Sequence, residues 1–115
     1  MNTYVIDVDH TICTAPWNDD CKAYDYKKAN PHPEMIQAIN KAYHEGNIII
    51  LFTARGMRTF NGNVELIENY HRPILEEWLL KHSVNYHDLI FGKPWGPNVH
   101  YIDDKNLSIE EFIKK

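Results

Sequence analysis

The stretch VIDVDHT at residues 5–11 decides how this chain folds. It closes the first apolar run of the sequence, which is typical of a buried strand, and it carries two aspartates, Asp7 and Asp9, separated by one residue. Neighbouring carboxylates repel each other and are costly to remove from water. A strand that ends in this pair therefore predicts a compensating charge, and a divalent cation is the obvious candidate.

Three later apolar runs also lead into polar residues. Because the carboxyl ends of parallel strands lie along one edge of a sheet, where open α/β sheets bind ligands, we expect these polar side chains to share one site. The run 47–52 is followed by Thr53, the run 89–91 by Gly92 and Lys93, and the run 99–102 by Asp103 and Asp104.

Helical patterns separate the predicted strands. Pro33 opens one helix and Gly46 stands where it would stop, which is the usual asymmetry of helix ends. A second helical period covers residues 64–82, and Pro73 within it must kink the helix or restart it. A last short pattern follows at residues 109–113. This alternation predicts an α/β fold, with a mainly parallel sheet and helices on both faces.

The length of the chain, 115 residues, fits a single domain over residues 1–115. Residues 14–32 and 56–63 follow no regular pattern. Loops as long as the first of these are usually functional or flexible in compact domains. We therefore expect residues 14–32 to form a flap beside the site.

The charge balance argues against a nucleic-acid partner. The chain carries 16 acidic and 12 basic residues, and without the four aspartates of the predicted site the two signs are equal. A nucleic-acid binder normally has a basic surplus on one face, and no cluster of Lys and Arg with interleaved aromatics supplies one. The acidity of the chain is therefore assigned to its site.

Cellular location and redox state follow from what the sequence contains. No apolar stretch approaches the roughly 20 residues of a membrane span, and the first residues lead straight into a strand without a basic region or cleavage site. We expect a soluble cytoplasmic protein with no membrane partner. Cys13 and Cys21 are then expected to be reduced, although a disulfide across the loop between them stays open.

Four ordered motifs give the chain a family resemblance. Asp7-Val-Asp-His-Thr11, Thr53, Lys93 and Asp103-Asp104 resemble the motifs of the haloacid dehalogenase-like (HAD) phosphohydrolases, over residues 5–104. The resemblance implies a Rossmann-like, HAD-like core. The short intervals between the motifs leave no room for a full cap domain, so the chain resembles the small capless type found among capsule-biosynthesis and deoxy-octulosonate phosphate phosphatases.

The resemblance implies roles for the aspartates. Asp7 would attack the phosphoryl group and form an aspartyl-phosphate, and Asp9 would protonate the leaving group and then activate water. Mg²⁺ would be held by Asp7, by the backbone carbonyl of Asp9 and by Asp103. Asp104 would support these ligands without binding the metal itself.

The same resemblance places four residues around the substrate: Thr53, Ala54, Arg55 and Lys93. Thr53 and Lys93 would stabilise the transferring phosphoryl group. Each has an ordinary alternative, because Thr53 alone is a strand-end cap and Lys93 alone a loop lysine. For Arg55 and for Arg58 a solvated loop position is as good an interpretation as substrate contact. His10 stands where glycine or asparagine is common in the family, and its role is open.

The expected function is Mg²⁺-dependent hydrolysis of a phosphomonoester, a sugar phosphate or similar small metabolite. An open site must accept a bulky substrate, borrow a wall from a second copy of the chain, or discriminate poorly. Two alternatives stay open. A polynucleotide 3′-phosphatase or nucleotidase would keep the same motifs. A non-enzymatic phosphoacceptor or catalytically idle phosphate-binding domain would also combine aspartates, threonine and lysine on a parallel sheet, although a phosphoacceptor needs an aspartate at the end of a middle strand and the run 48–53 has none. The substrate itself cannot be derived from fold and motif.

Overall fold

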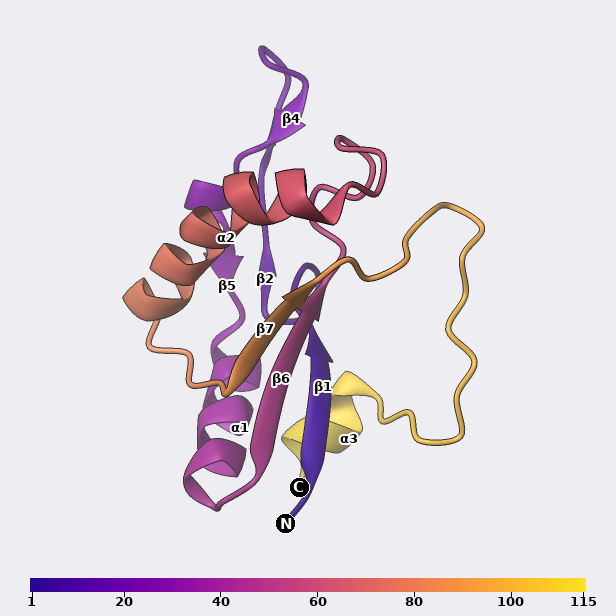
Figure 1. The fold of residues 1–115 in the computed structure, drawn as a ribbon. Coiled ribbons are helices and arrows are strands. Elements are labelled where there is room, and N and C mark those ends of the chain that lie inside the picture. The colour runs from indigo at the N-terminus through magenta and orange to yellow at the C-terminus, as the bar shows by residue number, and fades with distance from the viewer.

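A computed structural model describes all residues, 1–115. Strands and helices alternate along most of the chain, with a set of very short strands between the first strand and the first long helix (Figure 1). The elements are β1 (Thr3–Asp7), β2 (Cys13–Thr14), β3 (Trp17–Asn18), β4 (Ala23–Tyr24), the 3₁₀ helix η1 (Tyr26–Lys28), β5 (Asn30–Pro31), α1 (Pro33–His44), β6 (Ile48–Thr53), α2 (Val64–Lys81), β7 (Asp88–Phe91) and α3 (Ile109–Ile113).

The central sheet has three parallel strands in the order β1-β6-β7. Asp7 lies opposite Phe52, and Thr53 lies opposite Phe91, so the last residues of all three strands meet at one edge. Helix α1 connects β1 to β6 and helix α2 connects β6 to β7. The predicted α/β fold with a parallel sheet is confirmed.

The two long helices begin with the residues that the sequence indicates. Pro33 occupies the first turn of α1, and Gly46 follows its end with a φ of 91°, a conformation that glycine adopts without steric cost. Asn63 caps α2 by accepting a hydrogen bond from the Leu66 backbone N–H. Helix α2 runs through Pro73 as one element, so the helix does not restart there.

All three helices pack on the same face of the sheet. Ile6, Ile49, Leu51, Leu89 and Phe91 are buried on this face, and together with the helices they form the core. Helix α3 joins the same layer, because Phe112 packs edge-on against Tyr4 at 4.9 Å and α3 contacts α1. Figure 1 shows α3 passing behind β1, with α1 and α2 to the left of the strands in that view.

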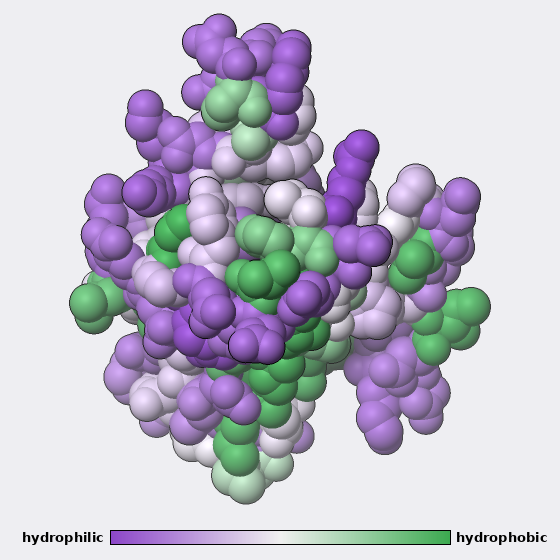
Figure 2. All heavy atoms as spheres, turned by 45° about the horizontal axis from the view of Figure 1, so that its top comes forward, coloured by the Kyte–Doolittle hydropathy of each residue, from purple (hydrophilic) through white to green (hydrophobic).

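The opposite face of the sheet is open, which corrects the prediction of helices on both faces. Val5 is 62% exposed and Ile90 is 40% exposed, while Ile50 and Phe52 between them are only partly covered. Figure 2 shows hydrophobic surface running through the lower middle of the molecule. The reason lies in the connection after β7, because residues 92–108 contain no helix that could cover this face.

The predicted fourth strand at residues 99–102 does not form. This segment belongs to a long excursion between β7 and α3 that runs outside the sheet (Figure 1, orange to yellow). Val99 is 43% exposed, Tyr101 is 52% exposed and Ile102 is 96% exposed. The Val99 backbone N–H bonds to Gly96 within a turn, and no ladder joins the segment to β1. Strand β1 is therefore an edge of the sheet.

The segment predicted as a flap, residues 14–32, has local structure. Strands β2 and β5 pair antiparallel, and β3 and β4 continue outward as a hairpin that projects beyond α2 (Figure 1). Trp17 and Tyr24 lie opposite each other on this hairpin with ring centroids 5.1 Å apart, and both are half exposed. Cys13 is buried, Cys21 is exposed, and both are free thiols.

Neither long helix has the combination of length and apolar character that a membrane span requires.

Candidate functional site

Asp7 forms an ion pair with Lys93 at the carboxyl edge of the sheet. The Lys93 Nζ donates a hydrogen bond to Asp7 Oδ1 at 3.0 Å, and the Thr11 hydroxyl donates to Asp7 Oδ2 at 3.2 Å. The Lys93 backbone N–H also bonds to the Thr53 carbonyl at 3.2 Å, which anchors the lysine to the end of β6. The Asp7 side chain is 35% exposed and the Lys93 side chain 17%, so the pair is open to a ligand.

Asp9 is paired with a different cation, the buried Arg55. The Arg55 Nε lies 3.0 Å from Asp9 Oδ2, and Arg55 Nη2 lies 3.0 Å from Asp9 Oδ1, which makes a bidentate pair. The Arg55 side chain has no exposed surface, whereas the Asp9 side chain is 27% exposed. Substrate cannot touch Arg55 in this conformation without first displacing what covers it.

These two pairs answer the question that the sequence posed about compensation. The two neighbouring carboxylates are neutralised by Lys93 and Arg55, residues that lie far away in the sequence and meet them through the fold. The cations take up both oxygens of each carboxylate, with help from Thr11. The negative charges of Asp7 and Asp9 at the end of β1 are therefore compensated by Lys93 and Arg55.

Buried neutral groups surround the Asp9–Arg55 pair. Burial, followed by the charge of Asp9, raises the pKa of the Cys13 thiol to about 12 and the pKa of Tyr26 to about 12. Burial, followed by the charge of Arg55, lowers the pKa of His71 to about 4. All three side chains are neutral near pH 7, so Arg55 and Asp9 carry the charges of this cluster.

Thr53 is fully buried, and its hydroxyl oxygen accepts a hydrogen bond from the Arg55 backbone N–H at 3.1 Å. This is the contact of a strand-end cap, the ordinary alternative that the sequence left open. Ala54, between them, is partly exposed, and Arg58 is exposed. Of the four residues predicted to touch substrate, Lys93 and Ala54 are the ones with accessible surface.

Asp103 and Asp104 lie apart from this arrangement. Both are exposed in the excursion after β7, where Asp103 Oδ1 accepts a hydrogen bond from the Lys105 backbone N–H at 2.9 Å. No group of three or more His, Cys, Asp or Glu side chains lies close enough together to hold a metal ion. The predicted ligand set of Asp7, Asp9 and Asp103 is thus not assembled, and the residues at the end of β1 do not fit a Mg²⁺ site by themselves.

His10 owes its position to the backbone. Its φ of 68° lies in the left-handed region, and its N–H donates to the Cys13 carbonyl at 2.7 Å within the turn that follows β1. Glycine and asparagine adopt this conformation most readily, which explains why the resembling family favours them here. The structure thus shows His10 in a turn position that glycine and asparagine favour.

Sequence reasoning missed the inner layer of the site. Cys13, Tyr26 and His71 contact or surround the charged pairs, yet no motif contains them, and Thr11 lies in the opening motif but was given no role. Gly56 is a related case, because a Cβ there would lie 2.7 Å from His71 Cδ2. The sequence indicates these residues only weakly. Thr11 ends the opening motif, and His71 lies within a helical period that says nothing about a site.

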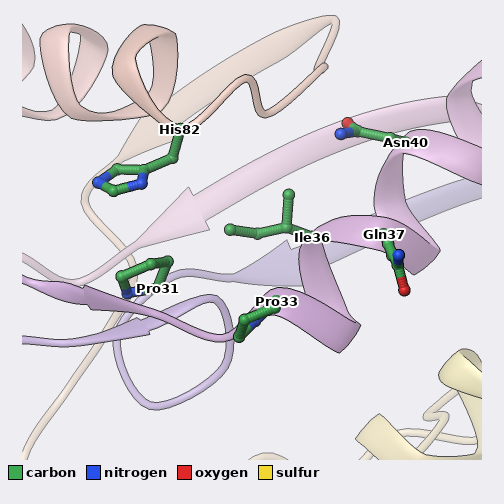
Figure 3. A pocket seen from close by; sticks show the side chains of 6 residues that line it. All are labelled: Pro31, Pro33, Ile36, Gln37, Asn40 and His82. Atoms are coloured by element: carbon green, nitrogen blue, oxygen red, sulfur yellow. The ribbon is translucent and has the colours of Figure 1, made fainter.

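A hollow of the surface lies away from these residues. It has a volume of about 330 Å³ and sits between the start of α1 and the end of α2 (Figure 3). None of its lining residues is a predicted site residue; they are Pro31, Pro33, Ile36, Gln37, Asn40 and His82. Asn40 is already bonded to Ser83 and Asn85, so the hollow offers few free polar groups.

One known structure is closely similar to this fold. A crystal structure of a structural-genomics target from Vibrio cholerae shares 34% sequence identity, with a TM-score of 0.86, over 100% of this chain and 89% of that one. No family model and no curated protein matches the chain. The chain belongs to one family with the Vibrio cholerae protein, and the resemblance to HAD-like phosphohydrolases stays a prediction from its motifs.

Proposed function

We propose that the protein hydrolyses phosphomonoesters in a Mg²⁺-dependent reaction with an aspartyl-phosphate intermediate on Asp7. The observation that carries this proposal is the pair of Asp7 and Lys93, 3.0 Å apart and partly exposed at the carboxyl edge of a parallel sheet. Ligands of open α/β sheets bind at this edge. A nucleophilic carboxylate beside a fixed cation is what transfer of a phosphoryl group needs.

The proposed reaction has two steps. The reactive form carries a proton on Asp9, taken up from solvent; Asp7 attacks the phosphorus atom, the ester P–O bond breaks, and the leaving oxygen takes that proton from Asp9. A water molecule then attacks the aspartyl-phosphate, gives its proton to Asp9, and releases phosphate with Asp7 restored. Lys93 offsets the charge on the phosphoryl oxygens throughout, and Thr11 holds the other oxygen of Asp7.

The Mg²⁺ requirement is part of the proposal and needs Asp103 as a third ligand, beside the Asp7 carboxylate and the Asp9 backbone carbonyl. Bound Mg²⁺ would offset the negative charge of the phosphate oxygens. Two features support a movement of residues 99–104 toward β1: the outer edge of β1 is unpaired, and the segment carries exposed apolar side chains such as Ile102. An unpaired edge readily accepts another strand.

The substrate class follows from the resemblance to small capless phosphatases, which favours a sugar phosphate or a similar small metabolite. The chain surrounds the Asp7–Lys93 pair with no separate cap domain, since the insertion after β1 forms only the short hairpin of β3 and β4. We place the protein in carbohydrate metabolism on this basis.

The test is phosphate release from a panel of sugar phosphates, nucleotides and 3′-phosphorylated oligonucleotides, with Mg²⁺ and with a chelator. We expect Mg²⁺-dependent turnover concentrated on sugar phosphates, and its loss in Asp7→Asn. Asp20→Asn is the matched control, because it makes the same change at an exposed position on the hairpin. Turnover of Asp7→Asn at the wild-type rate would contradict the proposal, and preference for the oligonucleotides would favour the polynucleotide phosphatase.

A further inference from the structure

Arg55 is a buried cation whose place in the proposed reaction is not explained by its motif. It is 2% exposed, and it is the only Lys, Arg, Asp or Glu among the buried residues of the chain. Burying an arginine is costly unless hydrogen bonds and a counter-charge compensate it. A fold that keeps it has a specific partner for it, and that partner is Asp9.

Two side chains besides Asp9 contact the Arg55 guanidinium, while its buried Nη1 has no hydrogen-bond partner. Its Nη2 lies 3.5 Å from Cys13 Sγ, and its central carbon lies 4.2 Å from the centre of the Tyr26 ring. Its backbone is tied to Thr53, so both ends of the residue are held. Asp9 is its only carboxylate partner, which means that nothing competes for the bidentate contact.

Asp9 keeps a free side despite this contact. Arg55 Nε and Nη2 donate to its two oxygens and the Cys13 thiol donates to Oδ1 at 3.8 Å, while 27% of the Asp9 side chain is exposed. An ionised carboxylate accepts about four hydrogen bonds. The pair therefore fixes the direction of the carboxylate without closing it to a proton donor or acceptor on the exposed side.

We propose that Arg55 is a positioning residue that holds the Asp9 carboxylate in the orientation needed for proton transfer, and does not contact the substrate. The inference rests on the proposed function, since it assigns Asp9 the proton-transfer role. It replaces the substrate contact that the motif suggested for Arg55. The planar Arg55 guanidinium donates two parallel hydrogen bonds and so fixes the plane of the Asp9 carboxylate. A lysine or an amide side chain at position 55 cannot make this bidentate contact.

The first test compares Arg55→Gln, Asp9→Asn and the double variant on the best ester of the panel. We expect Arg55→Gln to lower kcat on the order of 100-fold, with KM within about twofold, because proton transfer by a positioned group contributes 100- to 10,000-fold. In the Asp9→Asn background the same change adds little further loss, because the two residues act as a unit. Additive losses, or a raised KM with unchanged kcat, would overturn the proposal.

Two further variants control for folding and for loss of an arginine as such. Arg55→Lys keeps a positive charge at this buried position, and it serves as the test if Arg55→Gln does not fold. A loss of kcat at unchanged KM in Arg55→Lys supports the proposal. An unchanged kcat overturns it. Arg72→Gln removes another arginine that pairs with a carboxylate, Glu68 on α2, and should leave kcat within about twofold.

A measurement on the resting protein separates this inference from the proposed function. In the NMR spectrum of the wild type, the Arg55 Nε–H is expected to exchange slowly with water and to lose that protection in Asp9→Asn. Exchange at the rate of a solvated arginine in the wild type would overturn the pairing. A protected Nε–H in a protein without any phosphatase turnover would instead remove the proposed function and leave the pairing standing.

Discussion

The chain carries two pairs of carboxylates, and the structure treats them in opposite ways. Asp7 and Asp9 end a paired strand, and each is neutralised by a cation that the fold brings to it. Asp103 and Asp104 follow an equally apolar run but lie exposed, without a strand partner or an ion pair. A short apolar run therefore brings the polar residues at its end into a site only where it pairs with neighbouring strands and packs against a face of the sheet that helices cover.

The energetics of the two regions explain this outcome. Ile49 and Leu51 of β6 are fully buried beneath the helices, and the ladder with β1 and β7 satisfies the backbone on both sides. Burial of each such side chain contributes about 1.5–3 kcal/mol. If the run 99–102 paired with the outer edge of β1, its side chains on the open face of the sheet would have no helix to cover them. Its apolar content is the same in kind, but no helix covers it; Tyr101 instead lies over Lys93, whose Nζ is 4.8 Å from the centre of the ring.

Removal of the cation beside Asp7 should have the largest effect. We expect Lys93→Met to lower phosphate release on the order of 100- to 1000-fold, because the loss of one preorganised electrostatic contact costs that much in comparable sites. Lys114→Met, at an exposed position near the end of the chain, is the control. If Lys93→Met kept most of the activity in a kinetic assay, the neutralised pair would not be the site.

Matched truncations of two isoleucines would sharpen the contrast between the regions. Ile49→Ala should lower the free energy of unfolding by about 2–5 kcal/mol, because it opens a cavity in the core, whereas Ile102→Ala should change it by less than about 0.5 kcal/mol. Urea unfolding of both variants measures this. A large loss in Ile102→Ala would mean that the segment packs against the sheet in solution.

The buried histidine behind Arg55 makes stability depend on pH. His71 has a pKa of about 4 in the folded protein and an ordinary value of 6.5 when unfolded. Because the unfolded chain binds the proton more readily between these values, stability is complete above pH 6.5 and is lost as the pH falls toward 4. The loss at pH 5 relative to neutral pH should be about 2 kcal/mol.

His71→Phe provides the comparison for this pH effect, because it keeps a ring beside Tyr26 and removes the titrating group. Its unfolding midpoint in urea should vary less between neutral pH and pH 5 than that of the wild type. An equal pH dependence in both proteins would show that other groups cause it.

Sequence patterns anticipate what is local and periodic. The parallel sheet, both long helices and the placement of Asp7 and Lys93 at one edge follow from apolar runs, helix ends and motif order. The burial of Arg55 could not be derived in this way, because a loop arginine after Thr53 has the same local pattern whether it is solvated or paired with Asp9. The bare face and the missing fourth strand depend on what the excursion after β7 packs against, which no local pattern records.

The central claim is that Asp7, held by Lys93, accepts a phosphoryl group, and trapping that group tests it most directly. The protein is mixed with Mg²⁺ and the best ester of the panel, or with acetyl phosphate if no ester turns over, then quenched in acid and analysed by mass spectrometry after proteolysis. The account predicts a phosphoryl group on Asp7 of the wild type and none on Asp7→Asn. Turnover without any phosphorylated Asp7, or a phosphoryl group on another residue, would contradict it.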